Sequence, residues 1–118
     1  MATMDGKGAL KVDIERVGEV TLIRLTGDVD LHVSPQLRAK LKDVVREQRP
    51  RIVADMSGVP YIDSSGVATL VECLQGVSRY GGKLRLAALG KRTMSVFEIS
   101  RLDTVFTIFP TVEEALKA

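Results

Sequence analysis

The sequence predicts a single α/β domain built on a mixed, mostly parallel sheet of about five strands with about four helices. A chain of 118 residues is long enough for one hydrophobic core and too short for two ordinary domains. Two apolar segments near the start alternate with the period of a β-strand and are separated by a glycine turn. Each later strand-like segment follows a helix-like one, which is the pattern of parallel strands joined by helical crossovers.

The first two predicted strands form an antiparallel hairpin at one edge of the sheet. In residues 10–15, apolar residues alternate with charged ones, as expected for a strand with one buried face. Gly18 follows, and glycine in the first position of a two-residue loop supplies the positive φ that such turns require. The second strand is predicted over residues 20–26.

The first helix is predicted to begin at Ser34 and Pro35. A serine hydroxyl can cap free amides at a helix start, and proline at the first helical position loses no hydrogen bond. Apolar residues recur at helical spacing up to Val45, and Pro50 marks the end of this segment. The apolar run 52–54 is typical of a central strand.

The second helix is predicted to begin at Ser64 and to stop before the glycine pair at Gly81. The remaining predicted elements are a strand over 84–89, a helix over 93–100, a strand over 105–109 and a helix over 111–117. Thr111 and Glu114 have the spacing of a capping box. The predicted order is β-β-α-β-α-β-α-β-α.

Composition and charge argue against several classes of function. The chain has 17 basic and 15 acidic residues without a basic stripe, so nucleic-acid binding is not expected. No apolar segment approaches the ~20 residues of a membrane helix. The polar residues 1–8 do not resemble a signal peptide and are expected to form a flexible tail preceding the domain, residues 9–118. We therefore expect a cytoplasmic chain that is monomeric when free.

One cysteine and one histidine leave little scope for metal or hydrolase chemistry. Cys73 cannot form a disulfide within the chain, and no set of metal ligands or cofactor motif is present. A serine hydrolase needs a base, His32 is the only histidine, and Gly-x-Ser-x-Gly is absent. The sequence predicts that the protein is not an enzyme and has no cofactor.

Two polar segments follow strands of the predicted sheet. Residues 27–32 follow the second strand, and residues 55–66 follow the third. Loops that leave the carboxyl ends of parallel strands lie along one rim, where ligands and partners usually bind. If the second and third strands are neighbours in the sheet, we therefore expect Asp28, Asp30 and Ser64 to share a surface.

Ser64 occupies the first turn of the second predicted helix. Unpaired amides and the helix dipole at such a position favour an added phosphate. Gly66 removes side-chain bulk and would allow a partner to approach the backbone. By spacing alone, Asp-Ser-Ser-Gly at 63–66 is also an ordinary cap and turn, and the choice between Ser64 and Ser65 stays open.

Four segments together resemble the STAS domain over nearly the whole chain. They are GDVD at 27–30, DMSGVPYIDSSG at 55–66, GGKLRL at 81–86 and the final VEEAL. Within that family, the chain is most similar to the stand-alone bacterial anti-sigma factor antagonists, whose hallmark is a hydrophobic residue followed by Asp-Ser-Ser-Gly. One departure is Asp28, which stands where the family commonly has glutamate and keeps the charge.

The resemblance implies a phosphorylation switch at Ser64, supported by Asp63, Ser65 and Gly66. The unphosphorylated form would bind an ATP-dependent anti-sigma factor that is also a serine kinase, phosphorylation would release it, and a serine phosphatase would reset the cycle. By similarity, Asp30 should lie in the kinase-binding surface. The expected partner-binding residues are Asp28, Asp30, Leu31, His32, Ser34, Tyr61, Ile62 and Val67.

A second function stays open because similar stand-alone STAS subunits accompany lipid-transporting ABC systems. In that role the chain would bind the transporter's ATPase without being phosphorylated. An intact Asp-Ser-Ser-Gly at 63–66 favours the phosphorylation switch.

Overall fold

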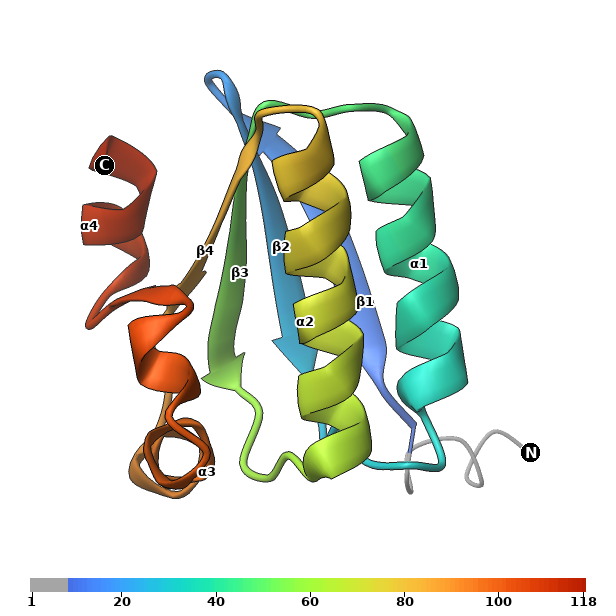
Figure 1. Ribbon diagram of the computed structural model, residues 1–118, viewed down its shortest axis with the longest axis vertical. Coiled ribbons are helices and arrows are strands. Elements are labelled where there is room, and N and C mark those ends of the chain that lie inside the picture. The colour runs from blue at the N-terminus through green and yellow to red at the C-terminus, as the bar shows by residue number, and fades with distance from the viewer. Residues whose placement is uncertain (1–8) are drawn as a thin grey trace.

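A computed structural model describes residues 9–118 and shows one five-stranded sheet with helices on both of its faces (Figure 1). The predicted tail, residues 1–8, lies outside the described residues. The strands are β1 (Lys11–Val17), β2 (Val20–Thr26), β3 (Arg51–Gly58), β4 (Lys83–Ala87) and β5 (Thr107–Phe109). The helices are α1 (Ser34–Arg46), α2 (Ser64–Arg79), α3 (Lys91–Ile99) and α4 (Val112–Lys117). This arrangement confirms the predicted element order.

The strands lie in the order β1-β2-β3-β4-β5, with β1 antiparallel to β2 and the other pairs parallel. Gly18 has a φ of 62° in the β1–β2 turn, as the hairpin prediction requires. β1 is an edge strand, and its burial is weaker than the alternating pattern suggests. Leu10 is buried, whereas Ile14 is 46% exposed. Ile14 is paired with Ile23 of β2, so it lies on the same face of the sheet as that buried residue, but at the outer edge.

Two apolar clusters hold the layers together. α1 and α2 lie side by side against one face of the sheet (Figure 1) and enclose the larger cluster. Its fully buried side chains include Ile23, Leu37, Ile52, Leu70 and Phe97. The smaller α4 covers part of the other face through the buried Ala115. Within residues 9–118, no helix combines the length and the hydropathy needed to cross a membrane.

The start of α1 differs from the prediction. Ser34 does not cap the helix, because its hydroxyl donates to the Leu31 carbonyl oxygen at 3.4 Å and its side chain is buried. The Asp30 carboxylate instead accepts hydrogen bonds from the amides of His32 at 3.0 Å and Val33 at 3.2 Å. An aspartate can close such a turn because its short side chain reaches amides two and three residues ahead.

The elements near the end of the chain also begin and end at residues other than those predicted. α3 begins at Lys91, two residues before the prediction, and β5 is only three residues long. Arg101 has a φ of 64°, which ends the helical segment and leads into a 3₁₀ turn over Leu102–Thr104. Val105 belongs to this turn and not to a strand. In α4, the predicted cap is confirmed, since the Thr111 hydroxyl accepts from the Glu114 amide at 3.1 Å.

Candidate functional site

The two predicted rim segments meet at the carboxyl ends of β2 and β3. The predicted segments are residues 27–32 and 55–66; because β3 extends to Gly58, we define the rim loops as residues 27–33 and 58–66. The Val29 amide donates to the Tyr61 carbonyl at 2.9 Å, and the Asp63 amide donates to the Val29 carbonyl at 3.1 Å. Val29 and Ile62 thereby form an isolated parallel β-bridge. These backbone contacts confirm that the two loops form one surface.

Asp63 is the centre of the hydrogen bonding in the rim loops. Its Oδ1 accepts from the Ser65 amide at 2.9 Å, the Gly66 amide at 3.1 Å and the Ser65 hydroxyl at 2.6 Å. Its Oδ2 accepts from the Leu31 amide at 3.0 Å in the other loop. One carboxylate therefore caps α2 and also joins the two loops.

These contacts set the pKa of the Asp63 carboxyl. Partial burial by itself would raise that pKa. The hydrogen bonds from the Ser65 hydroxyl and from the amides of Gly66, Leu31 and Ser65 outweigh it, so the pKa lies below its ordinary value. Asp63 is accordingly a stable anion beside the two serines at neutral pH.

The two serines of the motif have different environments. Ser64 is the first residue of α2 and is exposed. Ser65 is partly buried, and its hydroxyl donates to Asp63. The spacing of the motif left the choice between these serines open, whereas their burial and hydrogen bonding distinguish them.

Three amides at the start of α2 are already hydrogen-bonded within the chain, which differs from the expectation of unpaired amides at this position. Ser65 and Gly66 donate their amides to the Asp63 carboxylate, and Val67 donates its amide to the Asp63 carbonyl at 3.0 Å. A phosphate on Ser64 would therefore project from the helix start without replacing an amide contact. The helix dipole still favours an added negative group at this position.

Gly66 has an internal role that the sequence did not reveal. It is buried, and a Cβ at this position would lie 2.6 Å from the Val29 carbonyl oxygen and 2.8 Å from Cγ1 of Ile62. The expectation that this glycine opens the backbone to a partner is therefore wrong. The absence of a side chain lets the first turn of α2 pack directly against the Val29–Ile62 bridge.

The predicted partner-binding residues divide into an exposed and a buried group. Asp28, His32 and Tyr61 are exposed, Leu31 is 72% exposed, and Asp30 is half-buried with its carboxylate engaged by backbone amides. The side chains of Ser34, Ile62 and Val67 are buried. Their apolar contacts or internal hydrogen bonds support the rim loops from below, so we leave these three out of the partner surface.

The structure adds one cation to the site. The Arg92 guanidinium lies 6.0 Å from the centre of the Tyr61 ring, within the range of a cation–π contact. Arg92 belongs to the first turn of α3, so this contact connects a third segment to the rim loops. The basic pair at residues 91–92 is visible in the sequence, but nothing in the pattern connects it to Tyr61.

Comparisons with known proteins assign nearly the whole chain to one domain family. The sequence profile of the STAS domain matches residues 11–115. An anti-sigma-B factor antagonist of Bacillus subtilis is 28% identical over 99 residues, which cover 84% of this chain and 90% of that protein. An anti-sigma F factor antagonist of Paenibacillus polymyxa is 23% identical over 108 residues, covering 91% and 92%. These relatives are regulatory binding proteins, in agreement with the prediction that the chain is not an enzyme.

Solved structures share the fold. An anti-sigma factor antagonist from Mycobacterium paratuberculosis has a TM-score of 0.87 at 24% identity, with 94% of each chain covered. The phosphorylated form of the Bacillus cell fate determinant SpoIIAA has a TM-score of 0.71 at 27% identity, covering 91% of this chain and 97% of that one. The profile match, the anti-sigma factor antagonists among its relatives and the shared fold all agree, and the chain belongs to the STAS domain family.

Proposed function

We propose that this protein is an anti-sigma factor antagonist that works as a partner switch. In its unphosphorylated form it binds and sequesters an anti-sigma factor that is also an ATP-dependent serine kinase. Phosphorylation of Ser64 releases that partner, and a serine phosphatase restores the binding form. The relatives named anti-sigma factor antagonists support the general role. The observation that carries the switch is the exposed Ser64 hydroxyl beside a Ser65 hydroxyl held by Asp63.

The hydrogen bonding favours Ser64 over Ser65 as the phosphate acceptor. To attack a nucleoside triphosphate, a hydroxyl must turn toward the kinase and give up its proton. Ser65 would first have to break its 2.6 Å bond to Asp63 and leave that carboxylate with one donor fewer. Ser64 is exposed and adjacent to the same rigid turn, so it can be presented without disturbing the cap.

The charge of the rim loops explains how one phosphate would release the partner. A phosphoserine adds roughly −1.5 to −2 charge units. At residue 64 this charge would stand next to the Asp63 carboxylate and on the rim that carries Asp28 and Asp30. A partner complementary to the neutral serine would meet like charges, a mismatch of several kcal/mol when the interface is desolvated. About 4 kcal/mol corresponds to roughly a thousandfold loss of affinity.

The exposed apolar side chains indicate where the partner makes contact. Leu31 and Tyr61 stand out from the two rim loops, 72% and 40% exposed, on either side of the backbone bridge. Large apolar and aromatic residues are typical anchors of protein interfaces. We propose that these two side chains provide the apolar contact, with Asp28 and His32 at its margin.

The test is a comparison of wild type with Ser64→Ala, Ser64→Asp and Ser65→Ala. Each form is used to capture partners from a bacterial lysate, and affinity is then measured with the purified ATP-binding protein that wild type captures. We expect Ser64→Ala to bind within about threefold of wild type, because it keeps the surface neutral. Wild type phosphorylated by that kinase should bind at least about a hundredfold more weakly.

Ser65→Ala is the matched control, since it removes the neighbouring hydroxyl. It should still accept phosphate from ATP, whereas Ser64→Ala should not. Ser64→Asp carries less charge than a phosphate and should show an intermediate loss of binding. Equal binding by all forms, or labelling of Ser64→Ala by the kinase, would contradict the proposed switch.

A further inference from the structure

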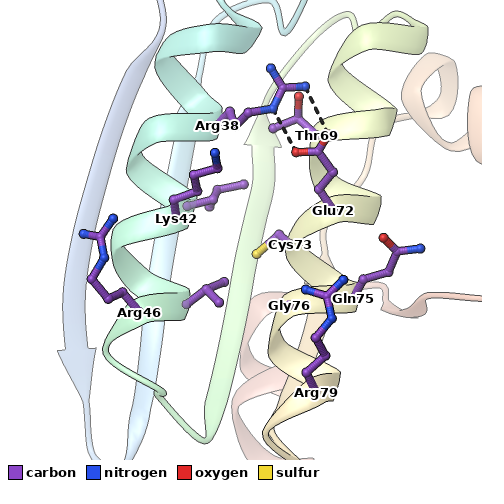
Figure 2. Close-up of a pocket in the computed structure, with 11 residues that line it drawn as sticks. Arg38, Lys42, Arg46, Thr69, Glu72, Cys73, Gln75, Gly76 and Arg79 are labelled. Atoms are coloured by element: carbon purple, nitrogen blue, oxygen red, sulfur yellow. Dashed lines mark hydrogen bonds and ion pairs between the residues drawn. The ribbon is translucent and has the colours of Figure 1, made fainter.

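A groove of about 380 Å³ lies between α1 and α2, on the outer side of the helix layer. Figure 2 shows it with the side chains that line it from both helices. Its volume is within the usual range of small-molecule sites, which begins at about 300 Å³. The residues of the rim loops do not line this groove.

The floor of the groove is apolar and closely packed. Leu41 and Cys73 are each 4% exposed, and Val45 of α1 lies against Gly76 of α2. Burial raises the pKa of the Cys73 thiol to about 11, so the thiol stays neutral at physiological pH. Figure 2 shows the Cys73 sulfur directed toward α1. This floor suits hydrocarbon or an aromatic ring.

The walls of the groove are predominantly basic. Arg38, Lys42, Arg46 and Arg79 line it, and Glu72 is the carboxylate among the lining residues. Arg38 Nε donates to Glu72 Oε1 at 2.8 Å across the two helices, and Arg46 is paired with Asp43 at 2.8 Å. Two cations therefore balance two carboxylates in these pairs.

The remaining two cations come from opposite walls. Lys42 extends from α1 on the side of the Arg38–Glu72 pair, where its charge adds to the lowering of the Glu72 pKa. Arg79 turns back along α2 toward Gly76 (Figure 2). Within the described residues 9–118, neither side chain forms an ion pair. Arginine and lysine together suit a carboxylate or phosphate, with arginine able to bind it through two parallel hydrogen bonds.

We propose that the α1–α2 groove binds a small amphipathic anion, whose acidic head lies between Lys42 and Arg79 and whose hydrocarbon part lies on the apolar floor. The span from Arg38 to Arg46 is about 12 Å on a helix that rises about 1.5 Å per residue. That length accommodates a short alkyl chain along the groove. The head is a carboxylate or a phosphate monoester, since both satisfy the same two cations.

The test is an amide NMR titration of the full chain with octanoate, octyl phosphate, inorganic phosphate and octanol, each below its micelle-forming concentration. We expect octanoate or octyl phosphate to cause saturable shifts at Lys42, Cys73, Gly76 and Arg79. The stronger of the two identifies the head group. Inorganic phosphate and octanol should each bind at least about tenfold more weakly, because each lacks half of the recognised chemistry.

Charge reversal locates the head group. Lys42→Glu and Arg79→Glu should each weaken binding at least about tenfold, because the new carboxylate repels the ligand. Lys40→Glu makes the same change of charge on an exposed residue of α1 outside the groove, and should alter the affinity less than twofold. No saturable shift with either amphiphile would overturn the proposal. Equal binding of inorganic phosphate, or tighter binding of an acidic helical peptide at the same residues, would also overturn it.

Discussion

The rim loops and the α1–α2 groove are two polar regions that use their charged groups in opposite ways. In the rim loops, the carboxylates of Asp30 and Asp63 accept hydrogen bonds from the backbone amides around them. In the groove, Lys42 and Arg79 form no ion pair within residues 9–118 and border an apolar floor. α2 contributes its first turn to one region and its later turns to the other.

This difference indicates what each region can do. Internal hydrogen bonds fix the shape of the rim loops and leave the Ser64 hydroxyl exposed, which suits an event at a single atom. The groove places basic side chains above an apolar floor, which suits the binding of a whole ligand. Substitutions in both regions test how separate the two regions are.

The largest effect is expected from Gly66→Ala, with Gly76→Ala as its matched control in the same helix. A Cβ at residue 66 meets the Val29 carbonyl oxygen at 2.6 Å, and backbone cannot move aside as a side chain does. We expect a loss of about 3 kcal/mol in the free energy of unfolding, measured by urea denaturation.

Gly76→Ala should change stability by less than about 1 kcal/mol. The atoms nearest to its Cβ belong to the Val45 side chain, the first at 3.0 Å, and alanine favours a helix interior over glycine by about 1 kcal/mol. Equal losses in the free energy of unfolding for the two variants would show that the rim loops accommodate an added methyl group as easily as the groove does.

The next largest effect is expected from Asp63→Ala, which removes the cap of α2 and the link to Leu31. Loss of the cap lowers the free energy of unfolding by about 1 kcal/mol. Loss of the hydrogen bond from the Leu31 amide brings the decrease to about 2 kcal/mol. Asp63→Asn keeps the shape and removes the charge. Urea denaturation at several pH values measures the free energy of unfolding of both variants.

The contribution of the Asp63 carboxylate to folding stability decreases at low pH. Its pKa is lowered from 3.8 on folding, so the carboxylate stabilises the folded state fully at pH values well above 3.8. That contribution is lost as the pH falls through the folded pKa. The gap in stability between wild type and Asp63→Asn should therefore narrow below about pH 4. A gap that stays constant down to pH 2 would contradict the lowered pKa.

A smaller difference is expected between the two serines. Ser65→Ala removes the 2.6 Å hydrogen bond to Asp63 and should lower the free energy of unfolding by about 1 kcal/mol. Ser64→Ala changes an exposed hydroxyl and should stay within about 0.5 kcal/mol of wild type. Thermal unfolding of both variants in one buffer checks this, and the reverse order would be inconsistent with the proposed phosphate acceptor.

The smallest effect is expected when groove variants are tested for partner binding. Lys42→Glu and Arg79→Glu lie outside the rim loops, so capture of the proposed kinase should stay within about twofold of wild type. A loss similar to that of Ser64→Asp would show that the partner covers both regions.

The fold was largely predictable because hydrophobic periodicity reports burial directly. The alternation in residues 10–15 and the helical spacing after Ser64 each predicted an element that the structure contains. The ends of the helices were less predictable, since several polar residues near one helix start can cap it. Ser34 was preferred for α1, but Asp30 closes the turn because its carboxylate reaches the amides and the Ser34 hydroxyl does not.

The candidate site was predictable as a set of loops and less so as a set of side chains. Strand order placed Asp28 and Ser64 on one rim, because neighbouring parallel strands end at the same edge. Whether a residue in a loop faces inward depends on the pairing of the two loops, which no periodic pattern encodes. Ile62 is therefore expected at the partner surface although it is buried. Val67 is also buried, but it belongs to the inward face of α2 and not to a loop.

Main-chain pairing between Val29 and Ile62 survives the replacement of side chains that point outward from the two loops. Exposed positions such as Leu31 and Tyr61 are thus free to change while the frame that carries them stays the same. If Leu31 and Tyr61 anchor the partner as proposed, each copy of a duplicated gene of this kind can acquire its own pair of anchors within a few substitutions. Related copies in one cell can in this way serve separate regulators without cross-talk.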